Sequence, residues 1–180
     1  MIRTIRKVYS LWEHEKEEKW LNEMSAAGFQ LRGVGFCTYH FEEGTPGEYV
    51  YRLEMLENWP TNYKSVTYIR FLEETGVEYI GSVMRWVYFR KRTEGGPFDI
   101  YSDVSSRIAH YNRMLVLLGA LIPVNMINTF NMLSSWFRSG ELSALLIAML
   151  CSALWLLLGY GLIRILMKKS RLKKEKILCE

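Results

Sequence analysis

The chain has 180 residues, of which 49% are hydrophobic and 23% charged, a mixture typical of a folded protein. The formal net charge of +4 is unevenly distributed, because the last 17 residues carry 7 basic and 2 acidic side chains while the first 113 carry 15 and 16. This nearly neutral N-terminal part argues against direct nucleic-acid binding. The three cysteines lack paired spacing, which argues against a disulfide-stabilised secreted domain.

The start of the chain predicts a strand and a helix. Apolar residues of segment 2–9 alternate with basic ones, and a run of acidic residues then opens a helix, where the helix dipole favours them. Trp20, Leu21 and Met24 lie at helical spacing, and Gly28 is a residue type that commonly ends a helix. We therefore expect an amphipathic helix between residue 13 and Gly28.

Strand patterns follow this helix, and the order of elements then recurs. Residues 29–41 are strand-forming, with glycines that mark a bend or bulge. Residues 49–56 alternate with the period of two that is typical of a sheet with one covered face. A second helical stripe at 68–72 precedes two further strands, at 77–80 and 85–90.

The order of these elements indicates a weak internal repeat of strand, helix and strand. It predicts an α+β fold, a ferredoxin-like split βαβ sandwich in which two βαβ units form one antiparallel sheet with both helices on one face. We assign this cytoplasmic domain to residues 1–94. Residues 95–113 are expected to form a linker and a juxtamembrane helix capped by Asp99 or Ser102.

Two apolar segments follow the soluble domain. Residues 114–133 carry no charged side chain, and residues 142–163 form a second apolar run after the short loop 134–141. A bilayer core of about 30 Å requires about 20 apolar residues in a helix, so both segments are predicted to be transmembrane helices. The basic tail 164–180 follows the second one, and positive charge at this place favours the cytoplasmic side. We expect a two-span protein of the cytoplasmic membrane with both termini cytoplasmic and the loop outside.

The sequence contains no motif of catalysis, cofactor binding or metal binding. It has no glycine-rich phosphate loop, no nucleophile elbow and no zinc-ligand spacing. His14 and Glu18 have the i, i+4 spacing of two ligands on one helix face, but no further histidine or cysteine lies nearby, so a solvated surface is favoured. The protein is therefore expected to be no enzyme and to bind no cofactor.

Aromatic residues are concentrated in the soluble domain. Packing in the core is the favoured role for any one of them, but those with a polar tip are candidates for a groove on the open face of the sheet. The predicted surface for a partner or ligand consists of Tyr51, Arg52, Arg85, Trp86 and Arg90.

Polar and small side chains recur along the apolar segments. Amides in hydrocarbon require hydrogen-bond partners and small residues allow close approach, so these faces are predicted to pack together or to form a homodimer. A transport path is disfavoured because neither span contains a charge. The residues concerned are Asn125, Asn128 and Asn131 in the first span and Ala144, Ala148 and Ser152 in the second.

The basic tail is expected to contact the lipid bilayer in addition to setting the topology. Basic residues at a cytoplasmic surface attract anionic lipid at about 1 kcal/mol per charge. The residues predicted to make this contact are Lys168, Lys169, Arg171, Lys173, Lys174 and Lys176.

Several motifs in the soluble part resemble a known family when taken in order. They are Glu17–Met24, Pro46–Glu54, Phe71–Gly81, Arg85–Arg90, and Gly96–Phe98 with Tyr101–Asp103. On these motifs the chain is similar to an uncharacterised bacterial family of domains of unknown function, with an N-terminal soluble domain and C-terminal membrane helices. Members are often encoded beside PadR-like winged-helix repressors, which implies a regulatory partnership, and the family supplies no catalytic residues.

These observations lead to one functional hypothesis and two alternatives. We expect a non-enzymatic, membrane-anchored regulatory protein whose cytoplasmic domain binds a protein partner, which the resemblance suggests to be a PadR-like transcriptional regulator. The first alternative is a sensor of a small molecule or of envelope stress. The second is an accessory subunit of a membrane transporter. The sequence favours neither alternative over the other.

Overall fold

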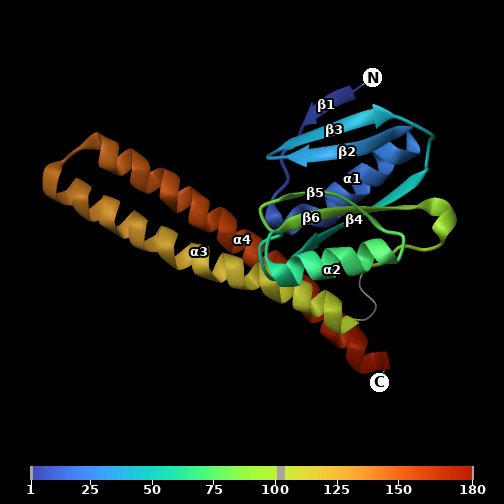
Figure 1. Cartoon of the computed structure of the whole chain (residues 1–180). Helices are drawn as coiled ribbons and strands as arrows, with labels where there is room; N and C mark the ends of the chain where they lie inside the picture. The colour runs from blue at the N-terminus through green and yellow to red at the C-terminus, as the bar shows by residue number, and fades with distance from the viewer. Residues whose placement is uncertain (1, 101–103, 180) are drawn as a thin grey trace. The chain divides into compact units, whose positions relative to one another are not determined.

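The computed structural model describes residues 2–100 and 104–179, and it describes the side chains of residues 2–100 and 105–174. The chain divides into two compact units, Met1–Ser106 and Arg107–Glu180. The first contains all the strands of the described residues, and the second consists of two long helices (Figure 1).

The first half of the N-terminal unit has the order β-α-β-β. Its strands are β1 (Ile2–Arg6), β2 (Phe29–Gly35) and β3 (Thr38–Glu43), and a short 3-10 turn, η1 (Leu11–Glu13), leads into helix α1 (His14–Ala26). Both β1 and β2 pair antiparallel with β3, so the sheet order is β1-β3-β2. Helix α1 confirms the helix predicted between residue 13 and Gly28.

The second half repeats this order. It contains β4 (Tyr49–Met55), α2 (Tyr63–Glu74), β5 (Glu78–Val83) and β6 (Trp86–Arg92), followed by the 3-10 turn η2 (Thr93–Gly95). The sheet order β4-β6-β5 matches that of the first half, and all pairs are again antiparallel.

Backbone details show that the two halves are related by 48 sequence positions. Both main helices end before a glycine with positive φ, Gly28 at 86° and Gly76 at 82°. A register shift occurs between Leu31 and Gly33 in the first sheet and between Tyr79 and Gly81 in the second. The internal repeat predicted from the sequence is therefore present, and it extends to a third strand in each half.

The α+β class is confirmed, and the strand arrangement differs from the single sheet expected of a ferredoxin-like sandwich. The strands form two three-stranded sheets, and segment 29–41 reverses at Phe36 and Cys37 and supplies two strands instead of one. Strands β2 and β5 lie side by side where the sheets meet. A side-chain carbon on Gly81 would lie 3.2 Å from the Val34 side chain, so glycine permits this close approach.

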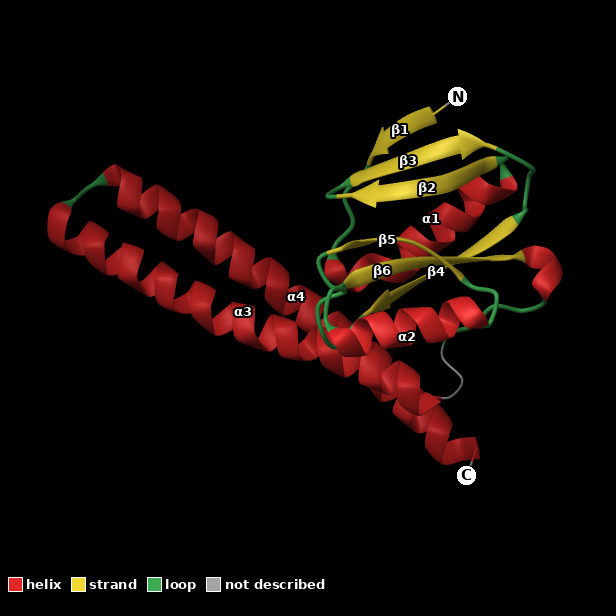
Figure 2. Ribbon diagram, viewed as in Figure 1, coloured by secondary structure: helices red, strands yellow, loops and turns green. Residues whose placement is uncertain are grey.

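Two hydrophobic cores stabilise the unit. Helix α1 packs on β2 and β4 and so contacts both sheets, whereas α2 packs on β5 (Figure 2). The core beside α1 contains Leu21, Leu31, Tyr39, Phe41, Tyr49, Tyr51, Leu53 and Tyr88. The core beside α2 contains Leu56, Ile69, Leu72, Val77, Val87, Phe89 and Phe98.

The C-terminal unit consists of α3 (Val104–Ser139) and α4 (Leu142–Cys179), joined at Gly140, whose φ is 69°. Both helices are long and apolar enough to cross a membrane, as the sequence predicted, and they fit a two-span membrane protein. Each extends beyond the predicted apolar segment, so the connection is shorter than the expected loop. Asp99 precedes the described start of α3, and Ser102, the other predicted cap, lies outside the described residues.

Candidate ligand-binding site

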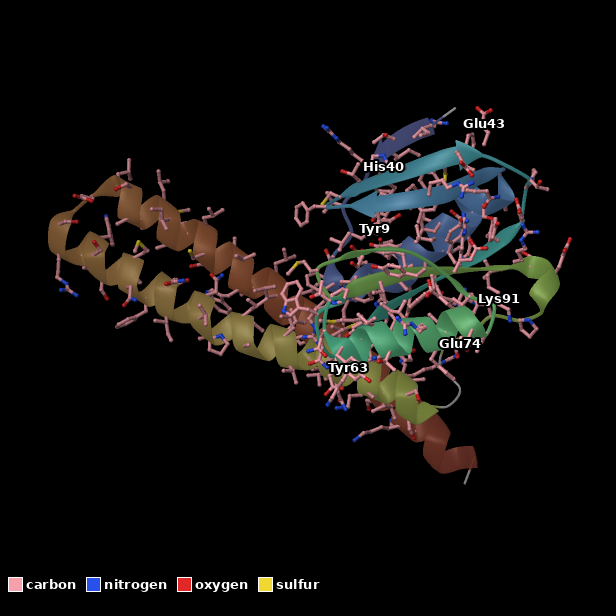
Figure 3. The ribbon with its side chains drawn as sticks, viewed as in Figure 1. Tyr9, His40, Glu43, Tyr63, Glu74 and Lys91 are labelled. Carbon is pink, nitrogen blue, oxygen red and sulfur yellow. The ribbon has the colours of Figure 1, made fainter. Side chains whose placement is uncertain are left out.

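A partly open cavity of about 210 Å³ lies in the N-terminal unit, where the turns of two hairpins and the start of α1 come together. Its walls are mostly apolar and include five aromatic side chains, and its lining contains one carboxylate. The lining includes Lys7, Tyr9, His14, Glu17, Phe36, Tyr39, Trp86 and Tyr88. Tyr9 is seen between the two sheets in Figure 3.

Each of the two hairpin turns at the cavity contains one non-glycine residue with left-handed backbone. Cys37 in the β2–β3 turn has a φ of 54° and Met84 in the β5–β6 turn has a φ of 56°, and both residues line the cavity. Left-handed backbone costs a residue other than glycine roughly 1–2 kcal/mol. Phe36 and Met84 expose 80% and 61% of their surface, so the rim of the cavity is apolar.

Glu17 projects from α1 into this aromatic environment and is only 7% exposed. The hydroxyls of Tyr39 on β3 and Tyr88 on β6 each donate a hydrogen bond of 2.6 Å to its Oε1. Burial raises the pKa of the Glu17 carboxyl because the charged form loses solvation, and the two hydroxyl groups oppose this rise. Within the described part of the chain, no lysine, arginine or histidine forms an ion pair with Glu17.

The tyrosines around Glu17 are correspondingly hard to ionise. Burial, followed by the neighbouring carboxylate, raises the pKa values of Tyr39 and Tyr88 above the ordinary range of a phenol. Burial also raises the pKa of Tyr9 to about 12, with Glu17 as the next cause. These phenols therefore keep their protons at neutral pH and act as hydrogen-bond donors.

Ring contacts hold the cavity walls in place. The Trp20 ring meets the Tyr39 ring edge-on at 5.0 Å, and Tyr39 meets Tyr88 edge-on at 6.5 Å. His14 stacks on Trp86 at 5.4 Å. Such pairs contribute about 0.5–1.5 kcal/mol beyond the area that they bury, so the walls are largely preformed.

A lysine already contacts the aromatic groups at one side of the cavity. The Nζ atom of Lys7 lies 4.4 Å from the ring centre of Trp20 and 5.0 Å from that of Tyr9. The backbone N–H of Lys7 donates to the carbonyl of Cys37 at 3.1 Å, which ties the segment after β1 to the β2–β3 turn. The hydroxyl oxygen of Tyr9 is buried and makes no hydrogen bond to any described residue.

Two residues of the predicted partner surface are buried. Tyr51 is fully buried, and its hydroxyl donates to Gln30 Oε1 at 3.0 Å and accepts from the Leu31 N–H at 2.9 Å. Arg90 is 7% exposed, donates to Glu78 at 2.7 and 2.8 Å, and also donates to the Leu31 carbonyl at 3.2 Å. Arg90 thereby joins the two sheets, and neither residue belongs to an open sheet face.

The other three residues of that predicted surface lie in different places. Arg52 pairs with Glu18 at 3.3 Å, and Arg85 donates to the Leu56 carbonyl from Nε at 2.9 Å. Trp86 alone lines the cavity. The structure therefore does not bring the five residues together, and partner binding by Arg52 and Arg85 stays a prediction.

In the C-terminal unit, Ala144 and Ala148 are buried, whereas Asn128 and Asn131 are exposed. The Oδ1 atom of Asn125 is buried without a hydrogen bond to any described residue. The remaining member of the predicted packing face, Ser152, is half-buried and donates to the Ala148 carbonyl at 2.7 Å. Packing of these faces, within one chain or between two, stays a prediction.

The predicted lipid-binding residues lie on the last turns of α4. Arg171, Lys173 and Lys174 are exposed, and Lys168 and Lys169 are half-buried. The side chain of Lys176 lies outside the described residues. Lipid contact stays a prediction.

Sequence reasoning missed the chemistry at the start of α1. His14 was expected on a solvated surface, but it is 8% exposed and stacks on Trp86, while Glu18 pairs with Arg52.

Among the described residues, no three histidine, cysteine or acidic side chains are grouped as metal ligands. The usable signal was the position of Glu17, three residues before Trp20 and four before Leu21, which places a charge on the apolar stripe of the helix.

Searches of curated proteins and of solved structures found no match. A family model described as a protein of unknown function, DUF2812, matches residues 13–122, which is more than half of the chain. The match extends from the start of α1 into α3 and includes Glu17, Tyr39 and Tyr88. Together with a soluble α+β unit followed by two apolar helices, this match confirms the resemblance found in the sequence motifs. The chain belongs to the DUF2812 family.

Proposed function

We propose that this protein is a membrane-anchored sensor that binds a small molecule in the cavity around Glu17. The two apolar helices hold the α+β unit at the cytoplasmic membrane, where occupancy of the cavity has a regulatory role. The observation that carries the proposal is the nearly buried Glu17 carboxylate, which two tyrosines orient in a partly open aromatic cavity.

This arrangement is costly as a purely structural element. An isolated buried carboxylate destabilises a fold because its charged form loses solvation, and an apolar residue would fill the same space without that cost. Concave, mostly apolar sites with a few convergent polar groups and a perturbed pKa are typical of ligand-binding sites. Glu17 and its two tyrosines meet this description.

The cytoplasmic location of the soluble unit is part of the proposal. It is supported by the basic residues that follow the second apolar segment, including the exposed Arg171, Lys173 and Lys174. Cys37, which is half-buried at the cavity, provides a test when Cys151 and Cys179 are replaced by serine. A membrane-impermeant maleimide is expected to label Cys37 in inverted vesicles and to spare it in right-side-out vesicles, and the reverse pattern would contradict the topology.

A second candidate function is binding of a protein partner, and the cavity rim favours it. Phe36 and Met84 line the cavity and expose 80% and 61% of their surface, and Val8, which lines a neighbouring hollow together with Phe36, exposes 76%. Exposed apolar groups that lie together are a feature of interaction sites. The family resemblance nominates a PadR-like repressor as the partner. Copurification of such a regulator with the full chain, lost in a Phe36→Ser, Met84→Ser double variant, would support this function.

The test of the sensor proposal uses the full chain in lipid nanodiscs. Small molecules that copurify with the chain are extracted, identified by mass spectrometry and added back, together with a compound panel, in thermal unfolding measurements. A ligand at 100 times its Kd stabilises the folded state by about 2.7 kcal/mol. The blocked control is Gly35→Leu, since Gly35 lines the cavity and a side-chain carbon there meets only Thr38, at 3.8 Å.

The proposal predicts that at least one compound stabilises the wild-type chain and fails to stabilise the blocked variant. It would be contradicted if no compound copurified and none stabilised the wild-type chain, or if stabilisation were equal in the Gly35→Leu chain.

A further inference from the structure

We infer that the cavity binds a small organic cation, an ammonium group with methyl or short alkyl substituents, between the Glu17 carboxylate and the aromatic walls. This inference rests on the proposed function and adds the chemical class of the ligand. Three independent features support it: the charge at the cavity wall, the aromatic surface and the size of the cavity.

The negative charge of the lining comes from Glu17, which is its only carboxylate. Both phenol hydrogen bonds go to Oε1, and Oε2 accepts none from the described residues. In a site with little water, a carboxylate gains more from a cation than from a neutral donor, because the low local dielectric strengthens the attraction. Glu17 therefore offers a preformed counter-charge with one oxygen uncommitted.

The aromatic walls complement the substituents of such a cation. The rings of Tyr9, Phe36, Tyr39, Trp86 and Tyr88 line the cavity, and ring faces attract cations through their negative quadrupole. The Lys7 ammonium, at 4.4 Å from Trp20 and 5.0 Å from Tyr9, already makes this type of contact at one side. Recognition of alkylated ammonium groups by several aromatic rings and a carboxylate follows the same physical rule.

The volume limits the ligand to a compact molecule. Pockets that hold drug-sized ligands measure about 300–1,000 Å³, and this cavity measures about 210 Å³. Tetramethylammonium and choline suit this space, and large polycyclic cations do not.

An anion is the opposing possibility, because Lys7 and His14 also line the cavity. A bound anion would be attracted by Lys7 but repelled by the Glu17 carboxylate in the same confined space. The two classes therefore predict opposite responses to charge removal. Glu17→Gln weakens a cation and strengthens an anion, whereas Lys7→Gln weakens an anion and leaves a cation equally or more tightly bound.

The experiment is isothermal titration calorimetry of the full chain in nanodiscs of phosphatidylethanolamine and phosphatidylglycerol, which carry no quaternary ammonium group. The ligands are tetramethylammonium and a trio of similar shape: choline, the uncharged 3,3-dimethylbutan-1-ol and the anionic 3,3-dimethylbutanoate. Glycerophosphocholine is added to distinguish a lipid headgroup from a free cation. The matched control is Glu74→Gln, because Glu74 is an exposed carboxylate on α2 (Figure 3).

We expect choline and tetramethylammonium to bind the wild-type and Glu74→Gln chains alike, and the alcohol and the anion to bind at least tenfold more weakly. Glu17→Gln is expected to weaken choline about tenfold or more, since a charge-assisted contact is lost. Tighter binding of glycerophosphocholine than of choline would identify a lipid headgroup as the source of the same ammonium chemistry.

Binding of the alcohol or the anion as tightly as choline would overturn the inference. If Gly35→Leu abolished that binding, the sensor proposal would still stand. Absence of binding by every cation would also overturn the inference. In that case the thermal unfolding measurements with copurified compounds would test the sensor proposal separately. An unchanged choline affinity in Glu17→Gln would show that the carboxylate has only a structural role.

Discussion

The two β-α-β-β repeats of the soluble unit share a backbone plan but differ in what their helices place against the sheets. In the first repeat, α1 carries Glu17, whose carboxylate two tyrosines hold in the cavity. The equivalent position of α2, 48 residues later, is Ser65, whose hydroxyl donates to the Asn58 carbonyl at 3.4 Å. The position equivalent to Tyr39 is Val87, which is fully buried in the second core.

Some features occur in both repeats and others in only one. Glycines at the helix ends, the register shifts and the two-residue turns at 36–37 and 84–85 occur at equivalent positions of both repeats, so they belong to the shared backbone plan. The left-handed residue differs, because Cys37 is second in its turn and Met84 is first. Of α1 and α2, only α1 carries a buried carboxylate, and the tyrosine partners of Glu17 come from both sheets. The buried carboxylate of the second repeat, Glu54, lies on β4 and accepts from Tyr68 at 2.7 Å. Ligand chemistry is therefore expected from the first repeat, with the second supplying Trp86 and Tyr88 as walls.

The largest expected effect concerns Phe41 and Phe89, which occupy equivalent positions of β3 and β6 and are both fully buried. Replacing either with alanine removes a ring from a close-packed core, and we expect the free energy of unfolding to fall by about 3–5 kcal/mol in each case. Chemical denaturation of the full chain in nanodiscs, followed by tryptophan fluorescence, measures both losses. Leucine replacements serve if the alanine variants fail to fold. Tolerance of one replacement alone would show that the two cores are not equivalent.

Arg90 tests how the two sheets are held together. Arg90→Met keeps much of the apolar bulk but removes the hydrogen bonds to Glu78 and to the Leu31 carbonyl, and the contact with the Tyr49 ring at 4.1 Å loses its charge. We expect a loss of about 1–3 kcal/mol, since a buried acceptor is left without its donor. The control is Arg92→Met, because Arg92 is exposed and its 3.7 Å pair with Glu48 should contribute at most about 1 kcal/mol. Equal losses in the two variants would contradict the sheet-joining role.

The two helix-terminal glycines provide a matched pair with a smaller expected difference. Alanine at Gly28 or Gly76 incurs the cost of left-handed backbone, roughly 1–2 kcal/mol at either position. At Gly28 the new side-chain carbon would also lie 3.2 Å from the Gly44 carbonyl, whereas at Gly76 it meets nothing within 4 Å. Gly28→Ala should therefore destabilise more than Gly76→Ala in the same denaturation assay. The reverse order would contradict the described packing at the end of α1.

The smallest effect at neutral pH is expected for Glu17→Gln. Because burial raises the pKa of Glu17 above that of the unfolded chain, the folded state favours the protonated carboxyl. Glu17 therefore stabilises the fold when the pH is below its pKa in the unfolded chain. This stabilisation is lost as the pH rises through its pKa in the folded chain. Relative to Glu17→Gln, the wild-type chain should lose thermal stability between acidic and neutral pH.

The groups that face Glu17 are Tyr9, Tyr39, Tyr88 and His14. The phenols keep their protons throughout this range, so a His14→Gln, Glu17→Gln chain compared with the His14→Gln single variant isolates the glutamate. A difference that stays constant with pH would show that Glu17 does not titrate as the structure indicates.

The parts of the fold that the sequence predicted are those with strong local patterns. The stripes of α1 and α2, the alternation of β4 and the two long apolar helices all depend on neighbouring residues. The β2–β3 turn was missed because its left-handed residue is Cys37 and not a glycine or asparagine. The two sheets were missed because strand pairing joins residues that are distant in the sequence.

The candidate site was only partly accessible from the sequence for the same reason. Tyr39 and Tyr88 are 49 positions apart and meet on Glu17 only after the sheets pack against α1. Tyr51 and Arg90 were assigned to an open face, but their polar ends are satisfied inside the unit by Gln30 and Glu78. Alternation along a strand predicts on which face of the sheet a side chain lies. Whether another layer covers that face depends on the tertiary structure.

The most direct test of the central claim is the rate at which N-ethylmaleimide modifies Cys37 as choline, or a copurified ligand, is added to the full chain. Cys37 lines the cavity, and Cys151 and Cys179 are replaced by serine. The control is a Cys37→Ser chain with cysteine at Phe71, which is 58% exposed on α2 and outside the cavity lining. Binding at the proposed site predicts saturable slowing at Cys37, with a midpoint equal to the Kd from calorimetry, and no change at position 71. Unchanged modification of Cys37 at saturating ligand, or equal slowing at both positions, would contradict it.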